Sequence, residues 1–159
     1  MSEFDLTTRF GVTALLQMQI TGLQAVTSDG GTSANLRADM IARAADDLAA
    51  LGCTAPQAPA MPGPVDPVAV DYVFLRSRMG SRVLALRWKA STDTAVQRAG
   101  RYFTAPDGLG DWRTFRRWAE TQPATGAQAD RAVADAARLF THFEACATRA
   151  AQTQEPTHA

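Results

Sequence analysis

Residues 6–27, LTTRFGVTALLQMQITGLQAVT, decide the fold class of this chain. Their apolar side chains recur at intervals of three and four residues, at Val12, Leu16, Ile20 and Leu23. That spacing matches the turn of an α-helix rather than the alternation of a strand. Leu15 and Met18 widen the apolar stripe. The stretch therefore predicts a long amphipathic helix that packs against other helices.

The next residues predict a turn, a second helix and a loop. Ser28-Asp29-Gly30-Gly31-Thr32-Ser33 collects turn formers, and Thr32 or Ser33 can cap the following helix. That helix carries a periodic row of apolar residues at Leu36, Met40, Ala44, Leu48 and Leu51. Gly52 stands where a glycine would end it. Five of the eight prolines lie in residues 54–67, which predicts an extended loop inside one domain.

Helical spacing returns after the proline-rich loop. A helix resumes near Pro67, and Met79-Gly80-Ser81 interrupts it with a bend or a close backbone contact. We expect a short helix over residues 91–103, and we expect Asp111 to cap the helix after it. That helix carries an aromatic face at Trp112, Phe115 and Trp118, and Gln122-Pro123 ends it.

The last helix is expected over about residues 126–151. It would bury one face, made of Val133, Ala136, Phe140, Phe143 and Ala147. The polar residues from Gln152 onward predict a frayed end. No run alternates long enough for a strand. The sequence therefore predicts an all-α bundle of about six helices without a sheet, with one domain over residues 1–152 and a flexible tail over 153–159.

The composition narrows the class of protein. No run of about 18 apolar residues is present, so a membrane-spanning helix is not expected. The acidic start, Met1-Ser2-Glu3-Phe4-Asp5, lacks the features of a signal peptide, which favours a cytoplasmic protein. Cys53 and Cys146 have no metal-ligand spacing and are expected to be free thiols.

Charges are sorted along this chain of zero formal net charge. Residues 1–75 hold eight acids and three arginines, a balance of −5. Residues 76–117 hold ten basic residues and three acids, a balance of +7, and residues 118–159 hold five acids and three bases, a balance of −2. The basic block predicts either an anionic ligand or acidic partner, or acidic helices of the same chain packed beside it.

Common catalytic constellations are missing from the sequence. It contains no P-loop, no dinucleotide-binding glycine motif, no nucleophile elbow and no Cys-x-x-Cys pair. His142 and His158 have no partner at metal-ligand spacing, so no metal site is predicted. Asp46-Asp47 and the pair Asp66 and Asp71 are interpreted as solvated faces or helix caps.

The arginines of the basic block admit two interpretations. Arg78 and Arg82 are four residues apart, so their guanidinium groups could hold one anion between them. Three further arginines, Arg113, Arg116 and Arg117, surround the aromatic residues of their helix. Such a mixture can bind nucleic acid, but the aromatics have the spacing of a core face and the overall charge is neutral. Packing is therefore the preferred interpretation.

Several segments resemble bacterial heme oxygenases that produce biliverdin. Arg37-Ala38-Asp39, followed by residues 47–52 (DLAALG), is similar to the family's "RADLAALG" helix end, which also precedes a proline-rich loop. Residues 72–83, YVFLRSRMGSRV, resemble the family's distal-helix signature Y-V-L-E-G-S-x-L-G-G-R-V. Gly100-Arg101-Tyr102-Phe103, then Trp112-Arg113 and Phe115, resemble its later G-x-x-F-F and W-R-x-F patterns. The resemblance covers roughly residues 6–150.

The resemblance implies an all-α fold with heme between a proximal and a distal helix. The family's first helix carries the histidine that ligates iron, but residues 6–26 are similar to a later helix and neither histidine matches the ligand position. The family's distal glycines bring the backbone close to iron. Gly80 matches one of them, while Arg76 and Ser81 stand at two others. Leu75 replaces the family's glutamate.

These departures predict a protein that has kept the fold and lost heme degradation. The ligand-binding residues implied at the distal helix are Tyr72, Arg76, Ser77, Met79, Gly80, Ser81 and Arg82. Two binding roles follow: a pocket for a tetrapyrrole such as heme or biliverdin, with arginines on its propionates, or a groove covered by a second copy or by another protein. The alternative is a working heme oxygenase with an atypical iron ligand.

Overall fold

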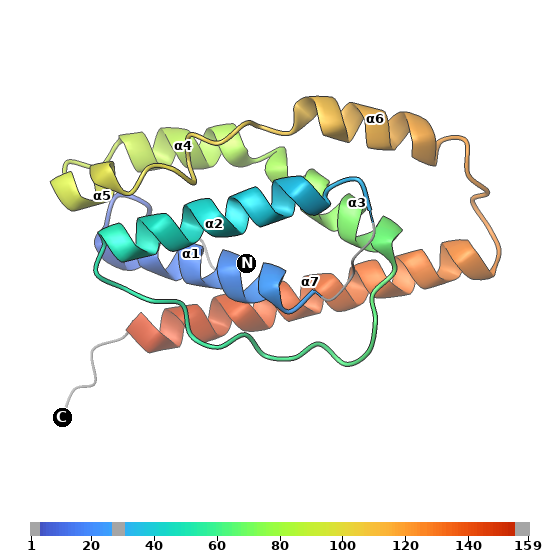
Figure 1. Cartoon of the computed structure of the whole chain (residues 1–159), viewed down its shortest axis with the longest axis horizontal. Coiled ribbons are helices and arrows are strands. Elements are labelled where there is room, and N and C mark those ends of the chain that lie inside the picture. The colour runs from blue at the N-terminus through green and yellow to red at the C-terminus, as the bar shows by residue number, and fades with distance from the viewer. Residues whose placement is uncertain (1–3, 27–30, 155–159) are drawn as a thin grey trace.

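A computed structural model describes residues 4–26 and 31–154 of the chain (Figure 1). These residues form seven α-helices and no strand, which confirms the all-α class and adds one helix to the expected number. The helices are α1 (Arg9–Gln24), α2 (Ala34–Ala50), α3 (Pro67–Arg78), α4 (Ser81–Lys89), α5 (Thr94–Arg98), α6 (Leu109–Ala119) and α7 (Ala127–Gln154). The predicted turn residues 28–30, the acidic residues 1–3, and the tail residues 155–159 with His158 lie outside the described part.

The helix predicted from residues 6–27 is the centre of the molecule. Figure 1 shows α1 between α2 and α7, and nearly every one of its residues from Gly11 to Leu23 is buried. The Thr8 side chain caps its start by accepting a hydrogen bond from the backbone N–H of Gly11 at 3.1 Å. Because most sides of this helix are covered, its apolar residues spread over a wide stripe, as the sequence indicated.

A glycine brings α1 and α7 close together. A Cβ atom built on Gly22 would lie 2.3 Å from Cε1 of the Phe143 ring, so only a hydrogen leaves room for that ring. Phe143 is half-buried against the core cluster around α1. This close contact gives the long C-terminal helix a defined position on the central one.

Several helix ends follow from local chemistry, as predicted. Gly52 has φ +71° after the last residues of α2, and the N–H of Cys53 bonds the carbonyl of Leu48 at 2.9 Å. Asp66 caps α3 through the backbone N–H of Val68, and Pro67 fills the first helical position. The break at residues 79–80 separates α3 from α4.

Other boundaries differ from the predictions. The helix expected over 91–103 is reduced to α5, because Trp88 and Phe103 stack at 5.5 Å and hold the chain in turns after it. Asp111 lies in the first turn of α6 and does not cap it. The cap position is Gly108, with a left-handed φ of +72°, and Asp107 accepts from the N–H of Leu109 at 3.0 Å. The helix ends at Ala119, before Gln122-Pro123.

The buried face of α7 is rotated from the one predicted. Val133 is 71% exposed and Phe140 is 49% exposed, while Leu139 and Cys146 are buried. Phe143 and Ala147 lie on the packed side, as expected. The helix also continues through residues 152–154, which were predicted to fray. The difference arises because α1 and α3 cover only a narrow strip of this long helix (Figure 1).

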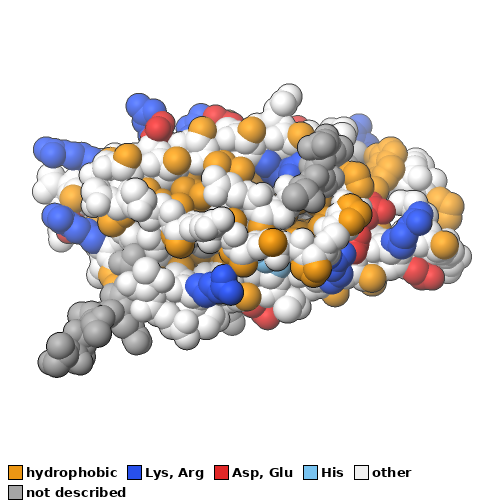
Figure 2. Space-filling view, turned by 60° about the horizontal axis from the view of Figure 1, so that its bottom comes forward, with side chains coloured by type: hydrophobic (Ala, Val, Ile, Leu, Met, Phe, Trp, Pro, Cys, Tyr) orange, Lys and Arg blue, Asp and Glu red, His pale blue; other side chains and the backbone are white. Residues whose placement is uncertain are grey.

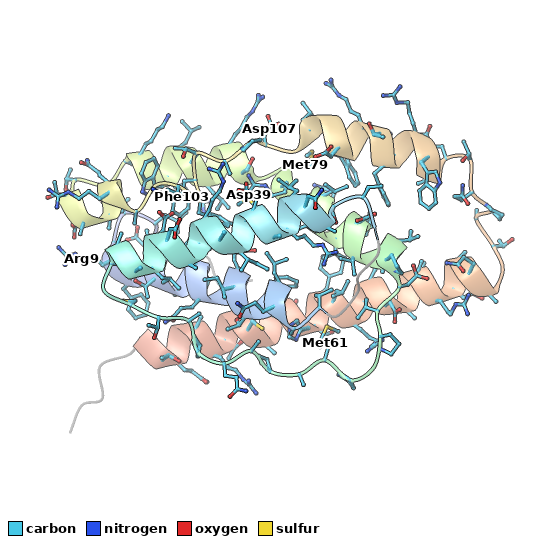
Figure 3. The ribbon with its side chains drawn as sticks, in the orientation of Figure 1. Arg9, Asp39, Met61, Met79, Phe103 and Asp107 are labelled. Carbon is cyan, nitrogen blue, oxygen red and sulfur yellow. The ribbon has the colours of Figure 1, made fainter. Side chains whose placement is uncertain are left out.

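The proline-rich segment has no regular structure between α2 and α3, and it runs beside α7 (Figure 1). Gln17 Nε2 donates to the carbonyl of Thr54 at 2.9 Å, and Arg138 donates to the carbonyl of Pro62. Met61, which Figure 3 labels on this segment, packs against the small cluster around Val65. The extended loop that the sequence predicted is therefore fastened to α1 and α7.

Candidate functional site

The residues implied in ligand binding gather around the end of α3 and the start of α4. Tyr72, Arg76 and Ser77 lie on α3, Met79 and Gly80 form the break, and Ser81 and Arg82 open α4. The side chain of Ser77 bonds the carbonyl of Phe74 at 2.7 Å, and the N–H of Gly80 bonds the carbonyl of Ser77 at 3.2 Å. These local bonds end α3.

The glycine at the break has no close neighbour. A Cβ atom on Gly80 would meet only the Ser77 carbonyl oxygen, at 3.7 Å, which is ordinary contact. The predicted bend is present, but the close backbone approach is not. Arg76, at the position of a family glycine, is exposed rather than turned into the protein.

Arg78 and Arg82 line the same hollow but make different hydrogen bonds within the protein. Arg78 is buried, donates to the carbonyl of Pro106 at 2.8 Å, and has its Cζ atom 5.8 Å from the centre of the Tyr102 ring. Arg82 is exposed and pairs with Asp107 at 2.8 Å. The helix ends between the two arginines, so the four-residue rule no longer places them on one face.

The space beside the break is small and is lined by charges of both signs. A hollow of about 150 Å³ is lined by Arg78, Met79, Ser81, Arg82, Asp107 and Leu109. Figure 3 shows Met79 and Asp107 where the connection to α6 passes the break. The N–H of Leu109 and then the Arg82 guanidinium hold the pKa of the Asp107 carboxyl below its usual value, so this carboxylate is charged at neutral pH.

Tyr72 begins a row of aromatic side chains that crosses from α3 to α6. Its ring lies 6.1 Å from Trp112, which stacks on Phe115 at 5.9 Å, and Phe115 lies 5.9 Å from Trp118. Phe115 is buried and Trp112 is half-buried, which confirms the predicted packing role for the middle of the row. The two ends differ, because Tyr72 is 40% exposed and Trp118 is 44% exposed.

Exposed arginines lie on the same two helices as this row. Arg76 follows Tyr72 by one helical turn on α3, and Arg113 and Arg117 lie one turn apart on α6. All three are exposed, and no side-chain hydrogen bond or ion pair joins them to another residue in the part of the chain that the structure describes. Arg116 instead pairs loosely with Glu120 at 3.7 Å. We call Tyr72, Arg76, Arg113, Arg117 and Trp118 the aromatic–arginine face.

Sequence reasoning missed a polar stripe inside the molecule. Thr13, Gln17 and Thr21 stand four residues apart on α1, and all three are buried. Their regular spacing in an otherwise apolar helix was the available signal. Beyond them on α7, Cys146 Sγ lies 3.7 Å from His142 Nε2.

The Cys146–His142 pair is not poised for nucleophilic chemistry. Burial raises the pKa of the Cys146 thiol and lowers the pKa of the His142 imidazole, so the neutral forms of both groups are favoured. Backbone hydrogen bonds to Gly22 and Thr21 oppose the shift of the His142 pKa. In the described residues no three His, Cys, Asp or Glu side chains come together as a metal site.

Comparisons with known proteins found no relative of this chain. No protein-family model, no curated protein and no solved structure matches it. Within residues 4–26 and 31–154, none of the helices has the length and apolar character needed to cross a membrane.

Proposed function

We propose that this chain is a heme-oxygenase-like helical module that binds an acidic segment of a partner protein and does not degrade heme. The loss of heme degradation is inferred from the size of the hollow at the α3–α4 break. Its volume of about 150 Å³ is well below the roughly 300–1,000 Å³ of ordinary small-molecule pockets. This small volume supports the proposal that the break holds neither heme nor biliverdin.

The histidine within the described residues also supports a non-catalytic role. His142 contacts Cys146 and the backbone of Thr21 and Gly22, all on α1 and α7. The α3–α4 break contributes none of these contacts. Iron held at the break would need another axial ligand, and Met79 is the only sulfur-bearing side chain that lines the hollow there.

Hemin titration tests the loss of heme chemistry. We expect no Soret shift when hemin is added, and no biliverdin when a reductant and oxygen follow. Arg76→Gly should behave in the same way, because Arg76 is exposed and its removal opens no cavity. A Soret shift with biliverdin would establish the alternative, an active oxygenase with an atypical ligand. A shift without biliverdin would replace the protein partner with a tetrapyrrole.

The binding role is supported by the aromatic–arginine face. Exposed Tyr72 and Trp118 offer large apolar contacts, and aromatic and arginine residues carry much of the binding energy in protein interfaces. Arg76, Arg113 and Arg117 add positive charge to the exposed surface of the same two helices, and no described residue forms an ion pair with them. Charge complementarity therefore favours an acidic segment, with its apolar side chains against the two aromatic rings.

Binding of a defined probe tests this face. The probe is a fluorescein-labelled amphipathic peptide with glutamates on one helical face and leucines on the other, followed by fluorescence anisotropy at low salt. Exchanging both Arg113 and Arg117 for glutamate should weaken binding by more than about 10-fold, because attraction becomes repulsion. Trp118→Ala should weaken it by a similar factor.

Arg98→Glu is the matched control for that experiment. Arg98 is exposed on α5, away from the aromatic–arginine face, and carries the same charge. We expect its substitution to change the affinity less than about 2-fold. Absence of peptide binding, or equal loss in the control and the double variant, would contradict the proposal. A dimer by light scattering that the double variant dissolves would assign the face to a second copy instead.

A further inference from the structure

A second, larger cavity lies on the other side of the molecule. It has a volume of about 320 Å³ and is formed by α1, the C-terminal half of α7 and the proline-rich segment. Figure 2 shows the face that carries α7 and this segment, where hydrophobic side chains are mixed with separate arginines. The volume falls at the small end of the range for organic ligands.

The floor of this cavity is polar and held in place. Gln17 and Thr21, each 5% exposed, line it from α1. The Gln17 amide donates to the Thr54 carbonyl at 2.9 Å, and the Thr21 hydroxyl donates to the Gln17 carbonyl at 2.8 Å. The Thr21 oxygen keeps lone pairs that can accept a hydrogen bond.

The walls combine one positive charge with apolar surface. Among the described residues that line the cavity, Arg149 is the only charged one. Its charge reaches the interior, because it lowers the pKa values of both His142 and Cys146. Pro56 and Pro59 supply rigid apolar surface from the loop, and Gln57 adds an amide donor.

We propose that this cavity binds a small organic monocarboxylate, with Arg149 on the carboxylate and the apolar body of the ligand against Pro56 and Pro59. Guanidinium groups pair with carboxylates through two parallel hydrogen bonds, which suits a single arginine at a pocket. Gln57 donates a further hydrogen bond to the anion. The site is separate from the aromatic–arginine face, so it does not depend on the proposed partner.

Binding at this cavity would join three parts of the fold. The ligand contacts α1, α7 and the proline-rich segment together, and a ligand that binds only the folded state raises the unfolding temperature. The experiment uses benzoate as the probe and benzamide as its neutral isostere. Thermal unfolding by circular dichroism and isothermal titration calorimetry are the two measurements.

We expect benzoate to raise the unfolding temperature in a concentration-dependent way, and benzamide to leave it unchanged. Arg149→Gln should weaken benzoate binding by about 10-fold or more, and Gln57→Ala by a smaller factor. Arg149 is exposed and Gln57 lies on a loop surface, so both variants should keep the circular dichroism spectrum of the parent. Arg131→Gln, on the same helix but outside the cavity, is the matched control.

Two outcomes would overturn this proposal. One is the absence of any benzoate effect at millimolar concentration in both measurements. The other is an equal effect of benzoate, inorganic phosphate and benzamide that survives Arg149→Gln, which would indicate general solvent action. Neither outcome bears on peptide binding, which uses residues of α3 and α6.

Discussion

Replacing Asp71 by alanine should lower the free energy of unfolding by about 3–5 kcal/mol. Asp71 is 5% exposed on α3, and its two carboxylate oxygens hold the segment that begins α2. They accept from the backbone N–H groups of Thr32 and Ser33 at 2.8 and 3.0 Å, and from both hydroxyls at 3.2 and 2.5 Å. Removing them leaves four donors without their acceptor, and the two donors of Ser33 are buried away from water.

The same carboxylate also balances a buried positive charge. Burial lowers the pKa of Arg37, which is 6% exposed, and the charge of Asp71 opposes that shift. Asp71→Ala therefore leaves the Arg37 guanidinium without its favourable carboxylate, which adds to the loss of hydrogen bonds. Urea unfolding followed by circular dichroism measures the total effect.

Two variants separate this account from a general loss of acidic residues. Asp71→Asn keeps one acceptor oxygen and should cost about half as much as the alanine variant. Asp39→Ala removes an exposed carboxylate whose ion pair with Arg43 lies on the surface of α2, and it should cost less than about 1 kcal/mol. Equal stability of the Asp39 and Asp71 alanine variants would contradict the proposal that Asp71 stabilises the fold by binding the start of α2.

Asp47→Ala should cost about 2–4 kcal/mol, the second large loss that we expect. Asp47 is 1% exposed near the end of α2. Its oxygens accept from the N–H groups of Arg101 and Tyr102 at 3.1 and 2.8 Å, and so position the chain between α5 and α6. Without them, two backbone donors lose their partners in a segment that has no helix to satisfy them.

The neighbouring aspartate is the matched control. Asp46 is exposed and pairs with the Arg101 side chain at 2.7 Å, so Asp46→Ala should cost less than about 1 kcal/mol. Urea midpoints of the two alanine variants, measured at equal denaturant slope, give the comparison. Similar midpoints for the two variants would show that the buried hydrogen bonds of Asp47 add nothing to the free energy of unfolding.

The pH dependence of Asp47 follows from its surroundings. Burial raises its pKa above the usual value, although the N–H groups of Tyr102 and Arg101 oppose that shift. The folded state therefore takes up this proton at a higher pH than the unfolded state, and the carboxyl adds stability as the pH falls through its folded pKa. Asp47→Asn should lack that gain, so its deficit relative to the parent should widen in acid.

Most helices could be predicted from the sequence because their signals are local. Apolar spacing located α1 and α2, Pro67 began α3, and Gly52 ended α2, since each depends on contacts within a few residues. The predicted helix over 91–103 was too long because a tertiary contact, the stacking of Trp88 on Phe103, overrides helical propensity there.

The candidate sites were predicted less well, for a related reason. The distal-helix residues do lie around one break, but the path of residues 106–109 closes the space beside them and gives Arg78 and Arg82 different partners. The cavity beside α1 is formed together with residues of the proline-rich segment and of α7. No local sequence pattern predicts that these segments pack together. Only the regular polar spacing of Thr13, Gln17 and Thr21 pointed toward it.

The sequence by itself determined an all-helical chain, because a helix closes its hydrogen bonds between residues four apart and shows its buried stripe in the spacing of apolar side chains. The tertiary structure alone decided which aspartates bind backbone N–H groups of distant segments. Asp46 and Asp47 are neighbours with the same chemistry, yet one is solvated and the other is buried. The partners of Asp71 and Asp47 lie 38 to 55 residues away in the chain, and such distant donors are brought to a carboxylate only by packing.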